Sequence, residues 1–282
     1  MKILITGNSG YIGSHLTQRL DKVNGVELYG LDKREPIAPI KKFSCNDITV
    51  PAYLHWQIED VDFDCVIHLA AEVAVGRSVT NPTVYYQTNT MGTLRVLQDL
   101  KFKRFVHAST GSAGPMNNPY GISKRASEQI VDQYCRENSI PFTTFRFYNV
   151  TGTDGIKPTN PDGLMWNLMN AQKSGVFNLF GDDYNTPDGS AVRDYTHVNE
   201  ICRALEQAID RSTNQIENLG HGVGTSVKQM IDLYKKVNNC DFDVQICPRR
   251  AGDLERSVLD NPSSFMQQLY NMKDLLKVDI IE

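Results

Sequence analysis

The stretch Thr6-Gly7-Asn8-Ser9-Gly10-Tyr11-Ile12-Gly13 follows a short apolar run, Lys2–Thr6, at the start of the chain. Glycines at these positions allow a sharp turn from a buried strand into a helix, and they let an anion approach the free N–H groups at the helix N-terminus. The spacing is G-x-x-G-x-x-G rather than the more common G-x-G-x-x-G. We interpret the stretch as the first strand–helix turn of a dinucleotide-binding sheet, with Gly7, Gly10 and Gly13 at the pyrophosphate.

An acidic residue follows at the distance that such a turn requires. A second β-rich run, Glu27–Leu31, ends beside Asp32, which is nineteen residues beyond Gly13. A carboxylate at this place can bond the hydroxyls of an adenosine ribose and repels a 2′-phosphate, which favours NAD over NADP. Lys33 and Arg34 could offset part of that repulsion, although we interpret them as a solvated loop. The predicted cofactor is NAD.

The first half of the chain alternates β-rich runs with helical patterns, which predicts an α/β fold with a Rossmann-type doubly wound parallel sheet. Expected strands are Lys2–Thr6, Glu27–Leu31, Cys65–Leu69, Phe105–Ala108 and Phe142–Phe147, and expected helices are Tyr11–Asp21, Tyr85–Leu100 and Tyr120–Glu137. Residues 152–192 are rich in Gly, Pro, Asn and Asp, which is typical of ligand-facing loops. Further helices are expected at Leu164–Ser174, at Val198–Asp210 and from Ser226, where Ser226 and Gln229 have capping-box spacing. We expect an NAD-binding domain over residues 1–152 and a smaller C-terminal substrate domain over residues 153–282, with some segments returning to the first domain.

The stretch Pro119-Tyr120-Gly121-Ile122-Ser123-Lys124 places a tyrosine and a lysine on one face of a helix, since they are four residues apart. The expected apolar face of this helix is Ile122, Ala126 and Ile130. A free tyrosine has a pKa of about 10, and a fixed ammonium together with a positive nicotinamide ring favours the phenolate and lowers that pKa. A shift of roughly three units corresponds to about 4 kcal/mol. The pair therefore predicts a proton acceptor beside the dinucleotide.

Composition narrows the function classes. The net charge of −4, without a long basic run, argues against a nucleic-acid partner, and no uninterrupted apolar run is long enough to span a membrane. The six cysteines form no Cys-x-x-Cys pair and no zinc-like cluster, so we expect reduced thiols, no metal and a cytoplasmic protein. His68, His197 and His221 are interpreted as packing histidines, and Asp188 and Asp194 as structural carboxylates.

Several motifs together resemble a known family. Thr6–Gly13, His68-Leu69-Ala70-Ala71 and Tyr120-x-x-x-Lys124 are similar to the extended short-chain dehydrogenase/reductase superfamily. In the second half, the run from Gly181 to Val198 resembles the UDP-glucose 4-epimerase group, as do Asn218–Val227 and Pro248–Asp253. The resemblance implies an NAD-dependent isomerase that inverts C4 of a UDP-hexose through a transient 4-keto sugar. It also implies a homodimer formed through the helices Tyr85–Leu100 and Tyr120–Glu137.

The same resemblance assigns roles by position. Tyr120 would be the base, Lys124 its electrostatic partner and a ribose ligand, and Thr110 the hydroxyl that hydrogen-bonds the reacting sugar. The implied cofactor positions, besides the three glycines, are Tyr11, Ile12, Asp32, Asp47, Ile48, Leu69, Ala70, Ala71, Asn89, Tyr120, Lys124 and Tyr148. The implied nucleotide-sugar positions are Asn149, Leu164, Arg193, Arg250, Asp253 and Ser257.

The chain departs from the family pattern in ways that bear on the pocket. Only Gly111–Pro119 separates Thr110 from Tyr120, where relatives have a much longer segment, so we expect a more open pocket. Val73 and Gly163 stand where close epimerases have a lysine and an asparagine. Ser257 aligns with a position beside the sugar C2 substituent, where a small side chain admits an N-acetyl group. This implies UDP-N-acetylglucosamine and its galacto epimer as substrates, as well as or instead of UDP-glucose and UDP-galactose.

Two alternatives stay open at this point. A nucleotide-sugar 4,6-dehydratase or a UDP-glucuronate decarboxylase resembles the same framework. The dehydratases carry Asp-Glu directly after the catalytic Thr, whereas Thr110 is followed by Gly111 and Ser112, and the nearby Glu of the decarboxylases is also missing. A catalytically silent NAD-binding sensor is the other alternative, and such proteins commonly lack the Tyr/Lys pair that this chain has.

Overall fold

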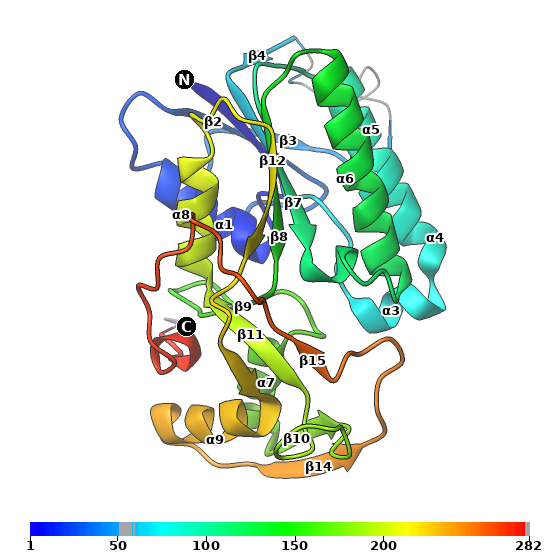
Figure 1. Ribbon diagram of the computed structural model, residues 1–282. Helices are drawn as coiled ribbons and strands as arrows, with labels where there is room; N and C mark the ends of the chain where they lie inside the picture. The colour runs from blue at the N-terminus through cyan, green and yellow to red at the C-terminus, as the bar shows by residue number, and fades with distance from the viewer. Residues whose placement is uncertain (51–57, 59, 280–282) are drawn as a thin grey trace.

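A parallel sheet of seven strands forms the upper part of the molecule in Figure 1, a computed structural model that describes residues 1–50, 58 and 60–279. Its spatial order is β3-β2-β1-β5-β7-β8-β12, and each neighbouring pair is parallel. The strands are β1 (Lys2–Thr6), β2 (Glu27–Asp32), β3 (Lys42–Cys45), β5 (Cys65–His68), β7 (Phe105–Thr110), β8 (Phe142–Phe147) and β12 (Gln215–Leu219). The predicted Rossmann-type doubly wound sheet is confirmed, and β3 and β12 extend it at its two edges.

Helices cover both faces of this sheet. On one face lie α1 (Tyr11–Leu20) and α8 (Val198–Gln207), and on the other lie α5 (Thr93–Asp99) and α6 (Pro119–Glu137) (Figure 1). Ile3 and Ile5 of β1 point into the core beneath α1 and α8, whereas Leu4 points into the core on the opposite face. The continuous apolar run at the start of the chain is therefore a strand buried on both sides, as parallel sheets require.

The second half of the chain forms a smaller α/β part below the sheet in Figure 1. Its strands are β9 (Asn149–Thr151), β10 (Val176–Phe180), β11 (Val192–His197), β13 (Gly224–Ser226), β14 (Asp243–Cys247) and β15 (Arg256–Ser257), and its helices are α7 (Leu164–Ser174), α9 (Val227–Asn238) and the short η3 (Asp274–Leu276). The predicted capping box is confirmed, because Ser226 caps α9 and Gln229 bonds back to the Ser226 backbone. Strand β12 and helix α8 return to the large sheet from this half. The domain boundary at residue 152 stays a prediction.

The predicted helix Tyr85–Leu100 is helical from Tyr85 to Asp99, but its first half is π-helical rather than regular α-helix. The chain forms α3 (Val75–Thr80), α4 (Pro82–Tyr85), a π-helical segment η1 (Tyr86–Gly92) and then α5. Within η1, the Asn89 side chain bonds a distant loop, and the Thr93 hydroxyl donates to the Asn89 carbonyl at 2.6 Å. Such side-chain bonds to the backbone compete with the regular ladder, and apolar periodicity does not record them.

The apolar face predicted for α6 is also wrong. Ile122 is 40 % exposed, while the buried residues of the helix are Gly121, Ser123, Lys124, Ser127, Glu128, Val131 and Cys135. The helix turns a largely polar stripe toward β7 and β8 because Lys124, Ser127 and Glu128 find partners there. Buried polar groups are tolerated when they are hydrogen-bonded. Short connections complete the fold: β4 (Asp62–Phe63) pairs with β6 (Lys101–Phe102), and a single 3₁₀ turn, η2 (Gly111–Ala113), follows β7.

Candidate active site

A cavity of about 760 Å³ lies at the carboxyl ends of the parallel strands, within the range of small-molecule sites. It sits where the strand order reverses between β1 and β5, the usual ligand crevice of such sheets. With the exception of Asn89, the predicted site residues line it. They are Gly7, Gly10, Tyr11, Ile12, Gly13, Asp32, Asp47, Ile48, Leu69, Ala70, Ala71, Thr110, Tyr120, Lys124, Tyr148, Asn149, Leu164, Arg193, Arg250, Asp253 and Ser257. One cavity thus holds residues from both halves of the chain, and their individual roles stay predictions.

The glycine turn has the geometry that an anion site needs. Gly7 has a φ of +76°, and a Cβ there would lie 2.6 Å from the Ala70 backbone nitrogen. A Cβ on Gly13 would lie 2.2 Å from the Gly7 carbonyl oxygen. Gly10 is the N-cap of α1, and no side chain caps the first turn of this helix. The N–H groups of that turn are therefore available to a pyrophosphate, so the turn fits a dinucleotide.

Asp32 ends β2 at the edge of the cavity, and its carboxylate is held in place by backbone. It accepts hydrogen bonds from the Ser9 nitrogen at 3.2 Å and from the Arg34 nitrogen at 3.0 Å. The two cations that follow are not simply a solvated loop, because the Lys33 ammonium donates to Glu72 at 3.0 Å and the Arg34 guanidinium forms an ion pair with the Asp32 carboxylate at 3.6 Å. An acidic group at this edge suits the ribose of NAD.

Asn89 is the predicted cofactor residue that does not line the cavity. Its amide nitrogen donates to the Glu72 carbonyl at 3.0 Å and to the Ser123 hydroxyl at 2.9 Å, and its amide oxygen accepts from the Glu72 nitrogen at 2.8 Å. Ser123 in turn donates to the Tyr120 carbonyl at 2.8 Å. In this arrangement Asn89 links the loop after β5 to helix α6, and a direct contact of Asn89 with the cofactor stays a prediction.

The start of α6 fixes the tyrosine beside the end of β7. The Asn118 side chain accepts from the Gly121 nitrogen at 2.8 Å, which caps the helix, and Pro119 occupies the first turn. A Cβ on Gly121 would lie 2.3 Å from the Ser112 carbonyl oxygen, so the short segment after Thr110 packs directly on the helix start. The Asn117 side chain also donates to the Gly252 carbonyl at 3.3 Å, across to the smaller part. A more open pocket than in relatives stays a prediction.

Gly111, directly after Thr110, packs against an aromatic ring. A Cβ built on it would lie 3.1 to 3.3 Å from three ring atoms of Tyr148. Those distances are shorter than ordinary van der Waals contact, so Gly111 leaves the Tyr148 ring free to approach the backbone at the cavity wall.

The protein's own groups do not lower the pKa of the Tyr120 phenol. Burial raises the pKa of Tyr120 to about 12, and a hydrogen bond with Thr110 lowers it only in part. Desolvation of the phenol, which the sequence-based argument left out, determines the pKa of Tyr120 in the chain by itself, and the lowering by Lys124 together with the nicotinamide ring stays a prediction. A phenolate at neutral pH requires the further positive charge of the nicotinamide ring.

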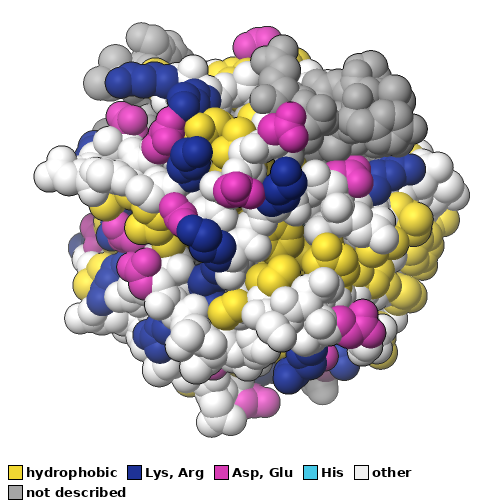
Figure 2. Space-filling model, turned by 90° about the horizontal axis from the view of Figure 1, so that it is seen from above, with side chains coloured by type: hydrophobic (Ala, Val, Ile, Leu, Met, Phe, Trp, Pro, Cys, Tyr) yellow, Lys and Arg dark blue, Asp and Glu magenta, His cyan; other side chains and the backbone are white. Residues whose placement is uncertain are grey.

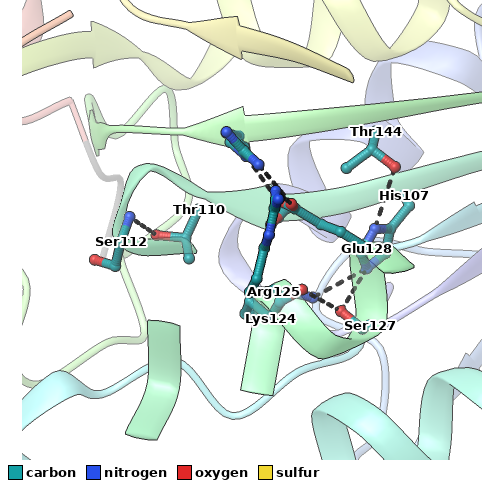
Figure 3. Close-up of polar contacts among 10 residues, drawn as sticks. His107, Thr110, Ser112, Lys124, Arg125, Ser127, Glu128 and Thr144 are labelled. Carbon is teal, nitrogen blue, oxygen red and sulfur yellow. Dashed lines mark hydrogen bonds and ion pairs between the residues drawn. The ribbon is translucent and has the colours of Figure 1, made fainter. Parts of the chain in front are cut away.

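Lys124 is deeply buried one helical turn after Tyr120, at the wall of the same cavity. Its side chain is 2 % exposed, and burial lowers the pKa of Lys124 to about 8. The ammonium nitrogen lies 3.3 Å from Nε2 of His107, as Figure 3 shows. The nearby Glu128 carboxylate is bonded instead to Arg146, Arg125 and Ser109. Lys124 therefore keeps a positive charge near the cavity at neutral pH.

The far end of the cavity carries two guanidinium groups. Arg193 is on β11, and Arg250 lies with its guanidinium carbon 3.8 Å from the centre of the Phe180 ring. Burial raises the pKa of the Asp253 carboxyl next to them. Asn178, Phe180 and Tyr195 line this end as well, although our reading of the sequence did not single them out. The alternation of buried Phe177 and Leu179 along β10 was the available signal, because it sets Asn178 and Phe180 on the other side of the strand.

Other predicted residues have structural partners. Asp194 accepts from the backbone of His221 and Gly222, Asp188 accepts from Ser190 and Ser226, and the His221 ring bonds Glu200. Among the described residues, no group of His, Cys, Asp and Glu could hold a metal ion, and no helix is long and apolar enough to cross a membrane.

The fold and the site together define an enzyme of the dinucleotide-binding short-chain dehydrogenase/reductase type. Residues 3–220 match the model of the NAD dependent epimerase/dehydratase family. The chain belongs to this family, and NAD is its cofactor.

Relatives extend over nearly the whole chain. The UDP-glucose 4-epimerase of Haemophilus influenzae is 34 % identical over 95 % of this chain and 92 % of its own length. The structure of the Bifidobacterium longum UDP-glucose 4-epimerase with NAD⁺ and UDP has a TM-score of 0.88 at 26 % identity, covering 98 % of this chain and 96 % of that one. The Campylobacter jejuni UDP-Glc/GlcNAc 4-epimerase has a TM-score of 0.78 at 29 % identity, covering 96 % and 95 %.

We expect Lys124→Met to stabilise the protein in the absence of NAD. The buried ammonium has a pKa of about 8 against 10.5 for the ordinary side chain, so the native state binds fewer protons than the unfolded chain between those values. Wild-type stability should therefore rise with pH across that window, and the variant should lack this rise. Urea unfolding at pH 7 should show the variant more stable by about 1–3 kcal/mol, and less so at pH 10. Exposed Lys22→Met is the control. Identical pH dependence in wild type and Lys124→Met would contradict the buried charge.

Proposed function

We propose that this protein is an NAD-dependent 4-epimerase of UDP-hexoses. One observation carries the proposal: a single cavity has the Thr110, Tyr120 and Lys124 side chains near the dinucleotide turn and Arg193 and Arg250 at its other end. The planar fork of arginine bonds diphosphate oxygens bidentately, which suits a nucleotide diphosphate whose sugar reaches back to the phenol. The relatives described as UDP-glucose 4-epimerases support this assignment.

NAD, held at the glycine turn and Asp32, would supply the acceptor and donor of the hydride at sugar C4. Tyr120 accepts the proton of the C4 hydroxyl on its phenolate oxygen and gives it back when the C4 oxygen is reduced. Thr110 hydrogen-bonds that oxygen, and Lys124 supplies positive charge behind the phenol. Arg193 and Arg250 hold the diphosphate while the 4-keto hexose turns to present its other face. The net redox change is zero, so one protein molecule needs no second oxidant.

The alternatives receive less support. A dehydratase or a decarboxylase needs an additional acid or base beside the catalytic threonine, and here Gly111 and Ser112 occupy those places. A silent NAD sensor has no need for the complete Thr110, Tyr120 and Lys124 set that lines the cavity.

We also propose that the substrates include N-acetylated UDP-hexoses. Ser257 is on β15, paired in register with Arg193 of β11, and it lines the same end of the cavity. A serine there is small enough to leave space for an acetamido group. The structural similarity to the Campylobacter jejuni enzyme described as a UDP-Glc/GlcNAc 4-epimerase supports this extension.

A homodimer through α4, η1, α5 and α6 completes the proposal. Tyr86, Met91 and Ile122 are 38 %, 47 % and 40 % exposed, and they lie on helical segments that contact each other. Seen from above, apolar side chains gather along the right-hand edge of the molecule in Figure 2, the side on which α4 and α6 lie in Figure 1. Covering such a patch with a second copy removes it from water.

Purified protein should interconvert UDP-galactose and UDP-glucose without net consumption of NAD. Tyr120→Phe removes the proton acceptor, so kcat should fall by about 10²- to 10⁴-fold while bound NAD is retained. Separation of the two UDP-sugars by chromatography, together with the NAD content of the protein, measures both quantities. Tyr134→Phe, on the same helix, is the matched control. Undiminished turnover by Tyr120→Phe would refute the mechanism, and a wild type that holds NAD without turnover would support the sensor.

Ser257→Tyr should lower the ratio of kcat/KM on UDP-N-acetylglucosamine to kcat/KM on UDP-glucose by about tenfold or more, because the ring fills the space proposed for the acetamido group. Ser257→Ala keeps that space and should leave the ratio as it is. The proposal fails if the tyrosine variant keeps the wild-type ratio.

Ile122→Asp should shift the protein toward monomers, since it buries a carboxylate in the proposed interface. Sedimentation velocity at micromolar concentration gives the oligomeric state. Val223→Asp, at a 54 % exposed valine of the smaller part, is the control. A monomeric wild type, or a dimer that Ile122→Asp leaves intact, would contradict this interface.

A further inference from the structure

A cluster of buried polar side chains lies behind Tyr120 and Lys124, between α6 and the strands β5, β7 and β8. His107 of β7 is at its centre and is fully buried. Its Nε2 lies 3.3 Å from the Lys124 ammonium and 3.2 Å from the Ser127 hydroxyl, and its Nδ1 lies 3.4 Å from the Thr144 hydroxyl (Figure 3). The epimerase mechanism proposed above has no use for this histidine.

The hydrogen bonds assign the protonation of His107. An ammonium can only donate, so Nε2 must accept from Lys124, and the ring proton on Nδ1 then points to Thr144. Ser127 uses its own proton for the Lys124 carbonyl at 2.8 Å. Burial, followed by the Lys124 charge and by His68, holds the pKa of His107 well below its usual value. His107 is thus a neutral imidazole with one acceptor, directed at the ammonium.

The charged groups around this cluster leave the lysine without a carboxylate in contact. From α6, Glu128 is the nearest acid, but its two oxygens accept from Arg146 of β8 at 2.8 and 2.6 Å, from Ser109 at 2.6 Å and from Arg125 at 3.0 Å. From β5, the His68 ring stacks on His107 with ring centres 5.9 Å apart, and burial lowers the pKa of His68 to about 3. Among the described residues, His107 is the one side-chain acceptor within hydrogen-bonding distance of the Lys124 ammonium.

We propose that His107 is a positioning residue for proton transfer, a neutral acceptor that holds the Lys124 ammonium in place without cancelling the charge that acts on Tyr120. A carboxylate in the same place would hold the ammonium equally well, but its negative charge would offset the positive field at the phenol. The ammonium has three protons, so the bond to His107 leaves two for the cavity side. This inference rests on the proposed function, because it explains how the phenolate is maintained. His107 keeps its own proton throughout, while the transferred proton moves between the C4 hydroxyl and Tyr120.

Two substitutions of His107 with side chains of nearly equal size separate the effect of the acceptor's charge from the effect of its shape. His107→Gln offers a neutral amide oxygen to Lys124, and His107→Glu offers an anionic one. In the wild type, kcat should rise with pH as Tyr120 ionises, and the pH at half the maximal kcat is the midpoint. We expect His107→Gln to have the wild-type midpoint to within about 0.3 pH units. His107→Glu should move that midpoint upward by about one unit, which is a tenfold lower kcat on the acidic side. His107→Leu, which has no acceptor, should lower kcat about tenfold with KM unchanged, and this loss is absent in His107→Gln.

A second measurement does not depend on turnover. The ultraviolet absorbance of tyrosinate, taken as the difference from Tyr120→Phe, follows the ionisation of Tyr120 in protein with NAD bound and in protein stripped of NAD. The midpoint should be higher in His107→Glu than in His107→Gln in both forms. His68→Gln is the matched control, because His68 bonds Thr6 and Thr93 and not Lys124, and it should leave the midpoint unchanged.

The outcomes distinguish the two proposals. Equal Tyr120 midpoints in His107→Gln and His107→Glu overturn the role of His107, whether or not the wild type is an epimerase. A His107→Leu variant with wild-type kcat overturns it as well, and this comparison remains available if His107→Glu does not fold. A wild type that fails to interconvert UDP-sugars overturns the proposed function, while the absorbance titration still tests His107.

Discussion

The burial of one ammonium group without a contacting carboxylate is the constraint on which the centre of this molecule depends. A charge at this depth is costly unless polar neighbours surround it, and α6 meets that need by turning its polar stripe inward. His107 accepts from the Lys124 ammonium and donates to Thr144, and Ser127 donates to the Lys124 carbonyl. Ile122, in the first half of the helix, is displaced to the surface, whereas Val131 and Cys135 in the second half are buried. The orientation of α6 therefore determines two features at once: the buried positive charge of Lys124 beside the cavity, and the side chains that the helix exposes to solvent.

The cavity depends on a second arrangement, the return of the chain to its first sheet. Strand β12 and helix α8 come from the second half, yet they pair with β8 and pack beside α1. Arg193 on β11 is therefore placed against the ends of the sheet strands by backbone, because β11 pairs with β9 directly after β8. The end of the cavity with Arg193 and the end with Tyr120 are therefore connected through paired strands. This connection suits a ligand that stays bound at the arginine end while its sugar moves at the tyrosine end.

Local patterns predicted much of this from the sequence. The bounds of β1, β8 and α7 agree with the expected ranges, because these are short β-rich runs or a helical pattern bounded by recognisable turn residues. The π-helical segment, the buried face of α6 and the raised pKa of Tyr120 did not follow, since each depends on partners far away in the chain. Asn89 bonds a loop seventeen residues earlier, and Glu128 bonds Arg146 on a strand that packs only in the folded molecule. The glycine turn and the Tyr120–Lys124 pair were recognisable because their chemistry is local.

The contact between Gly111 and the Tyr148 ring also limits how this scaffold can evolve. A Cβ at residue 111 would require the outer edge of the Tyr148 ring to move by a few tenths of an ångström. A larger residue at this place would therefore be accommodated only together with a small shift of the Tyr148 ring. The residue directly after Thr110 and the aromatic side chain at position 148 are thus coupled through space, and we expect them to vary together.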